Sequence, residues 1–502
     1  MKANTSTIYM QDWLALHPYN RMAETDQYYI DIANDILKII NQSTTSFSLN
    51  SEVKQTISCN LAAYFEDVIS QEGLWRAFIT KHKELYGKFL PFYSFSSDYY
   101  EDEINLEDVA FLLWLNIQLY VGNDKEEFIN PEEPSLIKLA KEIFNLLDGE
   151  FETAPENTFM TDFFSFENKD YHKFPAFAND AEWLFFQSYL LAPCNEEPIN
   201  TIIGQVHKHY PKASDKDRNA IVHDAVNRLM FSDPCGPLAL QINEWFSAIA
   251  GPAQPYKDYF DHFEFIDREE FYIIEKSNSH IKIRSVANGR EIDVTKEAIA
   301  DSSILVPWKT IITVSCAYYN NEWWFFGKFS IRKLNDDEDI RPAASDVKSI
   351  KAADPVYTIF TEASQGEPLM YFSSYEDLKE FFINGLKWED NDDNMMPDLK
   401  AFQNFVLYAN PKGMLIAPDI AEYVKDERNP MYNAEKAAEV ALDLFTVQGQ
   451  CPVDLLKYLE NSGRLPDAQI KSELGEEHGK ALLHNNWDFI ARLFLESYYR
   501  EE

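Results

Sequence analysis

The sequence predicts an α+β protein of several domains, with a mainly α-helical N-terminal half, a small antiparallel β barrel-like module and a C-terminal part of mixed α/β structure. Apolar residues recur at helical spacing through the N-terminal half, strand-like alternation begins after Gly251-Pro252, and both patterns occur towards the C-terminus. At 502 residues the chain also exceeds what one hydrophobic core usually organises. We expect a helical domain over 1–250 that divides near 150–175, a β module over 260–332, an acidic linker over 333–354 and an α+β domain over 355–502.

The helical half is predicted from apolar stripes. Within 26–41, Tyr29, Ala33, Ile36 and Ile40 share one face of a helix. The same texture predicts helices over 51–86, 105–121, 134–147, 181–191, 199–209, 216–230 and 237–249. Helix breaks are expected at Pro155, Pro198 and Asp233-Pro234.

The β module has the clearest local signals. Asn288-Gly289 and Asn320-Asn321 are typical of tight turns between paired strands. Strands are expected over 271–276, 280–286, 290–295, 311–319 and 323–332. Five short strands in roughly 65 residues predict a small barrel or a strongly twisted sheet.

The C-terminal part mixes both kinds of element. Strands are expected over 356–360 and 405–408, and a packed final helix over 480–500. Further helices are expected over 374–384, 418–425, 434–447 and 452–460.

The charge balance limits the classes of partner. The chain has 83 Asp plus Glu against 45 Lys plus Arg, a formal net charge of −38. Such a surface repels nucleic acid and anionic membranes, because both are bound through clustered Lys and Arg. We expect no direct nucleic acid and no membrane contact, and a protein partner, with a basic protein fitting the charge best.

Cysteine usage and the N-terminus predict a cytoplasmic protein. Five widely spaced cysteines without a Cys-x-x-Cys pair are typical of reduced thiols. The polar N-terminus has no secretory signal, and no apolar run approaches the roughly 20 residues that span a bilayer.

Four residues are candidates for a metal site. His207, His209, His223 and Asp224 offer imidazole and carboxylate ligands, and a His-Asp pair is found in metal-dependent hydrolases. In a helix, however, His207 and His209 point about 200° apart, and surface histidines are the simpler interpretation. The chain has no Gly-rich phosphate loop and no Gly-x-Ser-x-Gly elbow, so no cofactor is predicted and the catalytic residues stay unknown.

Paired acids are a second kind of signal. Glu66-Asp67 and Glu101-Asp102-Glu103 offer groups for cation binding or acid–base chemistry. In a chain so rich in acids, solvated acidic faces are the simpler interpretation.

Consecutive aromatic residues are the most unusual feature. Trp323, Trp324, Phe325 and Phe326 cannot all be buried by one amphipathic face, so some must meet a second layer, another domain or a partner. Internal packing is one interpretation, and these four residues are also the candidates for a protein-binding surface.

Several stretches resemble a known family. Leu-Ala-Ala-Tyr-Phe-Glu-Asp-Val-Ile at 61–69 and Leu-Tyr-Gly-Lys-Phe-Leu-Pro-Phe-Tyr at 85–93 are similar to an uncharacterised family of cytoplasmic Bacteroidetes proteins with a domain of unknown function. The segments 13–19 and 484–492 resemble it as well. The resemblance implies a bacterial cytoplasmic origin and no particular activity.

Two hypotheses follow. The first is an acidic cytoplasmic interaction protein or regulatory scaffold. The alternative is an enzyme whose site is assembled at a domain junction, with a metal-dependent hydrolase as one form of it.

Overall fold

The computed structural model divides into two compact units, Met1–Ser345 and Asp346–Glu502. It describes residues 7–43, 47–122, 128–163, 165–166, 169–252, 254–299, 303–334, 355–386, 397–410, 413–466, 469–495 and 499. The predicted fold class is confirmed: helices fill the N-terminal half, a small closed barrel follows, and the second unit mixes helices with strands. The predicted linker lies, from residue 335 onward, outside the described residues.

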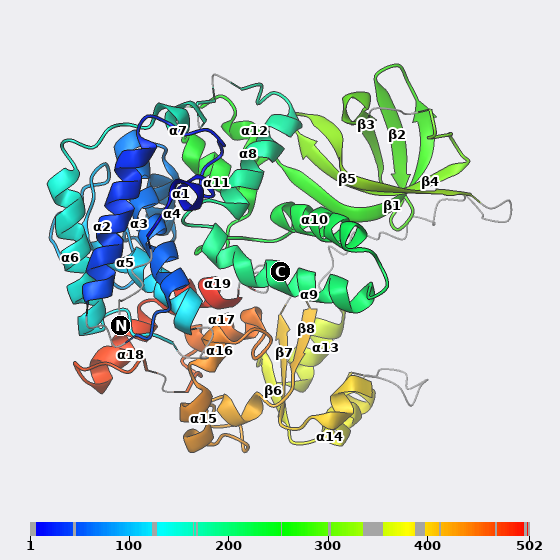
Figure 1. The fold of residues 1–502 in the computed structure, drawn as a ribbon. Helices are drawn as coiled ribbons and strands as arrows, with labels where there is room; N and C mark the ends of the chain where they lie inside the picture. The colour runs from blue at the N-terminus through cyan, green and yellow to red at the C-terminus, as the bar shows by residue number, and fades with distance from the viewer. Residues whose placement is uncertain are drawn as a thin grey trace. The chain divides into compact units, whose positions relative to one another are not determined.

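The first unit begins with a group of packed helices (Figure 1). Their bounds are α1 Met10–Leu14, α2 Asp26–Gln42, α3 Ser51–Ser70, α4 Leu74–Tyr86, α5 Leu106–Ile117, α6 Pro134–Glu150, α7 Thr158–Phe163, α8 Phe174–Phe186, α9 Ala192–His209, α10 Asp215–Ser232, α11 Ile242–Ala250 and α12 Lys257–Asp261. The predicted break at Pro198 is wrong, because this proline lies inside α9.

Helix α5 lies at the centre of this group. From Glu107 to Ile117 every residue is buried, as expected of a helix surrounded by others on all sides. Its start is fixed by a capping box in which Asn105 and Asp108 each bond to the other's backbone.

The continuous helical pattern predicted over 51–86 is interrupted in the structure. Helix α3 ends at Ser70 and α4 begins at Leu74. Gln71 and Gly73 adopt positive φ values of 54° and 92°, a conformation that ends helices. This break turns the chain sharply and places Glu72 between two helix ends.

The barrel completes the first unit. Its strands are β1 Glu264–Lys276, β2 His280–Ser285, β3 Glu291–Thr295, β4 Thr310–Tyr319 and β5 Glu322–Lys333, in the closed order β1-β2-β3-β5-β4. Strands β3 and β5 pair in parallel and the other pairs are antiparallel. This is the strand order of OB-type barrels, which serve many functions, so the order alone assigns none.

Aromatic side chains join the barrel to the helices. Phe177 of α8 stacks on Tyr319 of β4, with ring centroids 5.4 Å apart, and also packs against Phe231 of α10. The Tyr319 hydroxyl donates to the backbone oxygen of Tyr171 at 2.8 Å. Helix α10 also contacts β1 and β5 (Figure 1). The helices and the barrel therefore share buried surface.

The second unit combines a three-stranded antiparallel sheet, β6-β7-β8, with helices. The strands are β6 Leu369–Phe372, β7 Phe405–Asn410 and β8 Gly413–Ala417, and the helices are α13 Pro355–Ala363, α14 Tyr375–Glu380, α15 Ala434–Val440, α16 Asp443–Thr446, α17 Val453–Asn461, α18 Glu476–His484 and α19 Trp487–Leu495. The strand predicted over 356–360 is wrong, because this stretch belongs to α13. The single helix predicted over 480–500 is divided between α18 and α19.

All five cysteines are buried with free thiols: Cys59, Cys194, Cys235, Cys316 and Cys451. Burial raises the pKa of both Cys59 and Cys451 to about 12, and it also raises the pKa of Cys316.

Candidate functional site

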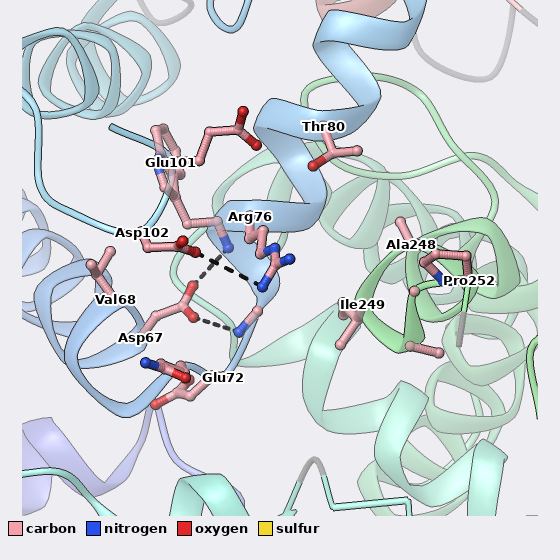
Figure 2. A pocket seen from close by; sticks show the side chains of 15 residues that line it. Asp67, Val68, Glu72, Arg76, Thr80, Glu101, Asp102, Ala248, Ile249 and Pro252 are labelled. Atoms are coloured by element: carbon pink, nitrogen blue, oxygen red, sulfur yellow. Dashed lines mark hydrogen bonds and ion pairs between the residues drawn. The ribbon is translucent and has the colours of Figure 1, made fainter. Parts of the chain in front are cut away.

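A pocket of about 470 Å³ opens at the break between α3 and α4 (Figure 2). This volume lies within the range of small-molecule sites. Its walls come from the end of α3, the start of α4, the loop before α5 and the end of α11. The lining residues that carry the following argument are Asp67, Glu72, Arg76, Glu101, Asp102 and Ala248. We refer to it as the acid pocket.

Asp67 accepts hydrogen bonds from backbone N–H groups at the start of α4. Its Oδ1 accepts the backbone N–H of Gly73 at 2.9 Å, and its Oδ2 accepts the N–H of Trp75 at 2.7 Å and the hydroxyl of Tyr189 at 2.6 Å. The first N–H groups of a helix have no partner within the helix, and its positive end favours a carboxylate. Burial raises the pKa of Asp67, although these three donors oppose the shift.

Glu72 is in the opposite situation. Its side chain is buried, with 6% of the residue exposed, and Oε1 has no hydrogen-bond partner within the described part of the chain. Burial, followed by the negative charges of Asp67 and Glu66, raises the pKa of Glu72 well above its ordinary value. A buried polar group usually finds a partner. Within the described residues, Oε1 of Glu72 is therefore a buried oxygen without a partner, on a carboxyl group whose neutral form is favoured by its surroundings.

The rim of the acid pocket is charged and exposed. Arg76 and Asp102 approach to 3.8 Å, and their side chains are 71% and 80% exposed. Glu101 pairs with Lys83 at 3.4 Å. Pairs this exposed contribute little to stability. They make the entrance polar while the floor stays buried.

A buried network lies next to the pocket on α3. His17 Nε2 lies 2.7 Å from Glu66 Oε2, and His17 Nδ1 lies 2.8 Å from the backbone oxygen of Trp13. The backbone oxygen accepts a hydrogen bond, and an ionised Glu66 accepts another, so this setting favours the cationic ring that donates from both nitrogens. Burial alone would lower the pKa of His17, but the charge and hydrogen bond of Glu66 outweigh it and raise that pKa.

The network continues from Glu66 to the N-terminal segment. Asn157 Nδ2 donates to Glu66 Oε1 and to the Tyr19 hydroxyl, both at 2.8 Å, and Tyr19 donates to Asp26 at 2.7 Å. These polar groups have partners, which indicates a structural role. Oε1 of Glu72 has no such partner among the described residues.

The four metal candidates do not come together as one group. His207 and His209 are exposed on α9, and His223 is exposed on α10. Asp224 is buried and accepts the backbone N–H of Lys328 at 2.8 Å. Arg228 and Arg268 also approach Asp224, at 3.5 and 3.3 Å.

Within the described ranges, no three or more His, Cys, Asp or Glu side chains are grouped so that they could hold a metal ion. The metal-dependent hydrolase stays a prediction.

The aromatic candidates take part in internal packing. Trp323, Trp324 and Phe325 are 9%, 3% and 6% exposed, and Trp323 and Phe325 belong to the barrel core. Phe326 is half-buried and packs edge-on against Phe231 of α10, with ring centroids 5.1 Å apart. In this arrangement they offer a partner little surface.

The sequence singled out part of the acid pocket but not Glu72. Asp67, Glu101 and Asp102 belong to the paired acids considered above, and the fold brings them to one pocket across more than 30 residues of sequence. The signal for Glu72 was Gly73, a residue that favours helix breaks. Because helical structure was predicted throughout 51–86, Glu72 was not recognised as lying at a break between two helices.

Fold and pocket together define an α+β protein whose helical part, joined to a closed barrel, carries an acid pocket. None of the helices in the described ranges is both long enough and apolar enough to cross a membrane.

The chain belongs to the family described as "Protein of unknown function (DUF3843)", whose model matches residues 7–305 and 331–496. The acid pocket lies wholly within the matched residues. No curated protein and no solved structure matches the chain.

Proposed function

We propose that this protein is a small-molecule-binding protein whose ligand occupies the acid pocket. One observation carries the proposal: the Glu72 carboxyl group is buried in the lining of a pocket without a hydrogen-bond partner for Oε1 in the described chain. Leaving such a group unsatisfied costs about 1–3 kcal/mol. A ligand that pairs with Glu72 removes this cost.

The setting of Glu72 supports the proposal. The neighbouring Asp67 accepts hydrogen bonds from three donors, so buried carboxylate oxygens in this region can be paired by the protein itself. On the opposite wall, Ala248, Ile249 and Pro252 present an apolar surface across the pocket from Glu72 (Figure 2). Apolar walls with a few polar groups are typical of ligand sites.

The test uses the whole chain and a variant in which the pocket is filled. Ala248 is half-buried in the wall, so Ala248→Leu places three more carbon atoms in the cavity without changing a charge. Both proteins are dialysed against a pooled metabolite extract, and retained compounds are identified by mass spectrometry. A compound retained by the wild type and lost in Ala248→Leu supports the proposal. Retention of the same compounds by both proteins, or of none, contradicts it.

A second candidate function is the one expected from the sequence, which is binding of a protein partner in a bacterial cytoplasm. The observation that favours it is a run of exposed apolar side chains before β4: Ile304, Val306 and Trp308 are 54%, 43% and 43% exposed. Trp308 also has a φ of 57°, which is unusual for a bulky residue. Exposed tryptophans are enriched at protein interfaces.

This candidate has its own test. Cross-linking in native lysate, read by mass spectrometry, is compared between the wild type and Trp308→Ala. A stoichiometric partner cross-linked beside β4 and lost in Trp308→Ala supports the interaction hypothesis. The same partner in both proteins, or none, argues against this surface.

A further inference from the structure

The helix ends around the acid pocket favour one sign of charge. The pocket is lined by the last turn of α3, through Asp67 and Val68, and by the last turn of α11, through Ala248 and Ile249. A helix C-terminus carries unpaired carbonyl groups and a partial negative charge. The N-terminus of α4 also meets the pocket, but its partial positive charge is already met by the carboxylate of Asp67.

The described side chains that line the pocket are negative or neutral, with one exception. Asp67 and Glu66 on α3 face Glu72, and the loop before α5 adds Glu101 and Asp102 to the lining. The hydroxyls of Tyr29 on α2 and Tyr189 before α9 are also close enough for electrostatic interaction. Helix α11 adds no charged side chain to the lining.

The exception is Arg76, the one cation among the described lining residues. Its side chain is 71% exposed and pairs with Asp102 at the rim. It therefore does not neutralise Asp67 and Glu72 at the buried floor, whereas the charge of Glu66 is already met by His17.

On this basis we infer that the acid pocket binds an organic cation, a protonated amine or a guanidinium group, through the carboxyl group of Glu72. The inference rests on the proposed function and specifies its ligand class. An ammonium or guanidinium group forms charge-assisted hydrogen bonds with a carboxylate, and a guanidinium group is weakly enough hydrated to suit a partly apolar site.

A metal ion fits less well. Ca²⁺ and Mg²⁺ take six or more oxygen ligands. Both oxygens of Asp67 already accept hydrogen bonds from the protein, and Asp102 is engaged at the rim with Arg76. Among the described carboxylates of the lining, Glu72 is the buried one whose Oε1 has no partner.

Binding of a cation is coupled to a proton. In the empty pocket, burial and the neighbouring negative charges raise the pKa of Glu72, so its protonated form is favoured there. When the cation enters, Glu72 gives this proton to the solvent, and its carboxylate forms a charge-assisted hydrogen bond with the ligand. Affinity for the cation then rises with pH below the pKa of Glu72 in the empty pocket, by up to about tenfold per pH unit.

The experiment compares matched cations and neutral isosteres on the full chain. N-Methylguanidinium is paired with N-methylurea, and n-butylammonium with n-butanol. Their binding is followed by ligand-observed NMR between roughly pH 5 and 9, a range that lies above the ordinary pKa of a Glu side chain. The variants are Glu72→Gln, which keeps shape and removes charge, and Ala248→Leu, which fills the pocket. The matched control is Glu84→Gln, which makes the same change at a side chain of α4 that is 57% exposed.

The expected result is binding of a cation at least about tenfold tighter than its neutral isostere. Glu72→Gln removes both this preference and the rise with pH. Ala248→Leu abolishes binding, and Glu84→Gln leaves it unchanged. Thermal unfolding of each variant shows that it is folded.

Two outcomes overturn the inference in different ways. If neutral isosteres bind as well as cations and only Ala248→Leu weakens them, the pocket binds small molecules but not through charge, and the proposed function stands without this ligand class. If no probe binds and the metabolite test above also finds no ligand, both proposals fail.

Discussion

The imidazole of His17 and the carboxylate of Glu66 form an ion pair of 2.7 Å in which the two side chains are only 2% and 1% exposed. The pair connects the segment after α1 to the middle of the helical part. Removing one partner of a buried pair leaves the other charge unpaired, which is far costlier than losing a surface pair.

We expect Glu66→Gln to lower the free energy of unfolding by about 3–5 kcal/mol. The matched control is Asp35→Asn, which breaks the exposed pair of Lys38 and Asp35 and should cost less than about 1 kcal/mol. Urea unfolding followed by circular dichroism measures both. Equal effects of the two substitutions would contradict a buried ionic role for Glu66.

Glu72 should make stability fall with rising pH in the ligand-free protein. Its pKa in the folded state lies above the ordinary value of 4.5, so the folded state holds the proton more tightly than the unfolded state. The resulting stability is fully present below the unfolded pKa and is lost as pH rises through the folded pKa.

In Glu72→Gln this loss is absent. We expect the variant to gain about 1–3 kcal/mol relative to wild type at alkaline pH compared with acidic pH. Urea titrations across the pH range measure the difference, with Glu84→Gln as the surface control. A difference that does not change with pH would show that Glu72 titrates normally.

His82 should lower the stability of the folded protein at acidic pH. Burial lowers the pKa of His82 to about 4, and its Nδ1 lies 2.7 Å from the backbone oxygen of Lys88. Because the folded state resists protonation, stability falls as pH drops from the unfolded pKa of 6.5 towards 4, with a slope of up to about 1.4 kcal/mol per pH unit. In His82→Gln this part of the slope should vanish, and an unchanged slope would assign acid sensitivity to other groups.

Phe177 should control the joint stability of the helices and the barrel. Its ring packs against Phe246 and Tyr319, with centroid distances of 5.0 and 5.4 Å, and it is fully buried. We expect Phe177→Ala to cost about 3–5 kcal/mol. Phe159→Ala, which removes a ring that is 50% exposed, should cost about 1 kcal/mol or less.

The same variant tests whether helices and barrel unfold together. If they form one cooperative unit, unfolding monitored by helical circular dichroism and by tryptophan fluorescence shifts by the same amount in Phe177→Ala. Separate transitions would indicate that the aromatic contact is weaker than its burial suggests.

Sequence patterns were sufficient where local and tertiary preferences agree. The stripe of Tyr29, Ala33, Ile36 and Ile40 predicted α2, and Asn320-Asn321 predicted the turn between β4 and β5. Both residues of that turn have positive φ, as asparagine tolerates. In these places the residue type itself determines the backbone.

Local preference was misleading where packing decides. The run Val-Tyr-Thr-Ile-Phe at 356–360 is rich in β-branched and aromatic residues, yet it lies in a helix that buries Phe360 against the sheet of the second unit. The acid pocket shows the corresponding limit for function. Asp67 and Asp102 are 35 positions apart, and only the packing of the helices brings them to one cavity.

The buried thiols make local opening directly measurable. Cys59 lies in the helical part, Cys316 in the barrel and Cys451 in the second unit, and each is inaccessible in the folded state. An alkylating reagent in native buffer can react with one of them only when that region opens. Counting labelled sites by peptide mass over time therefore gives separate opening rates for three regions, without introducing a probe into the chain.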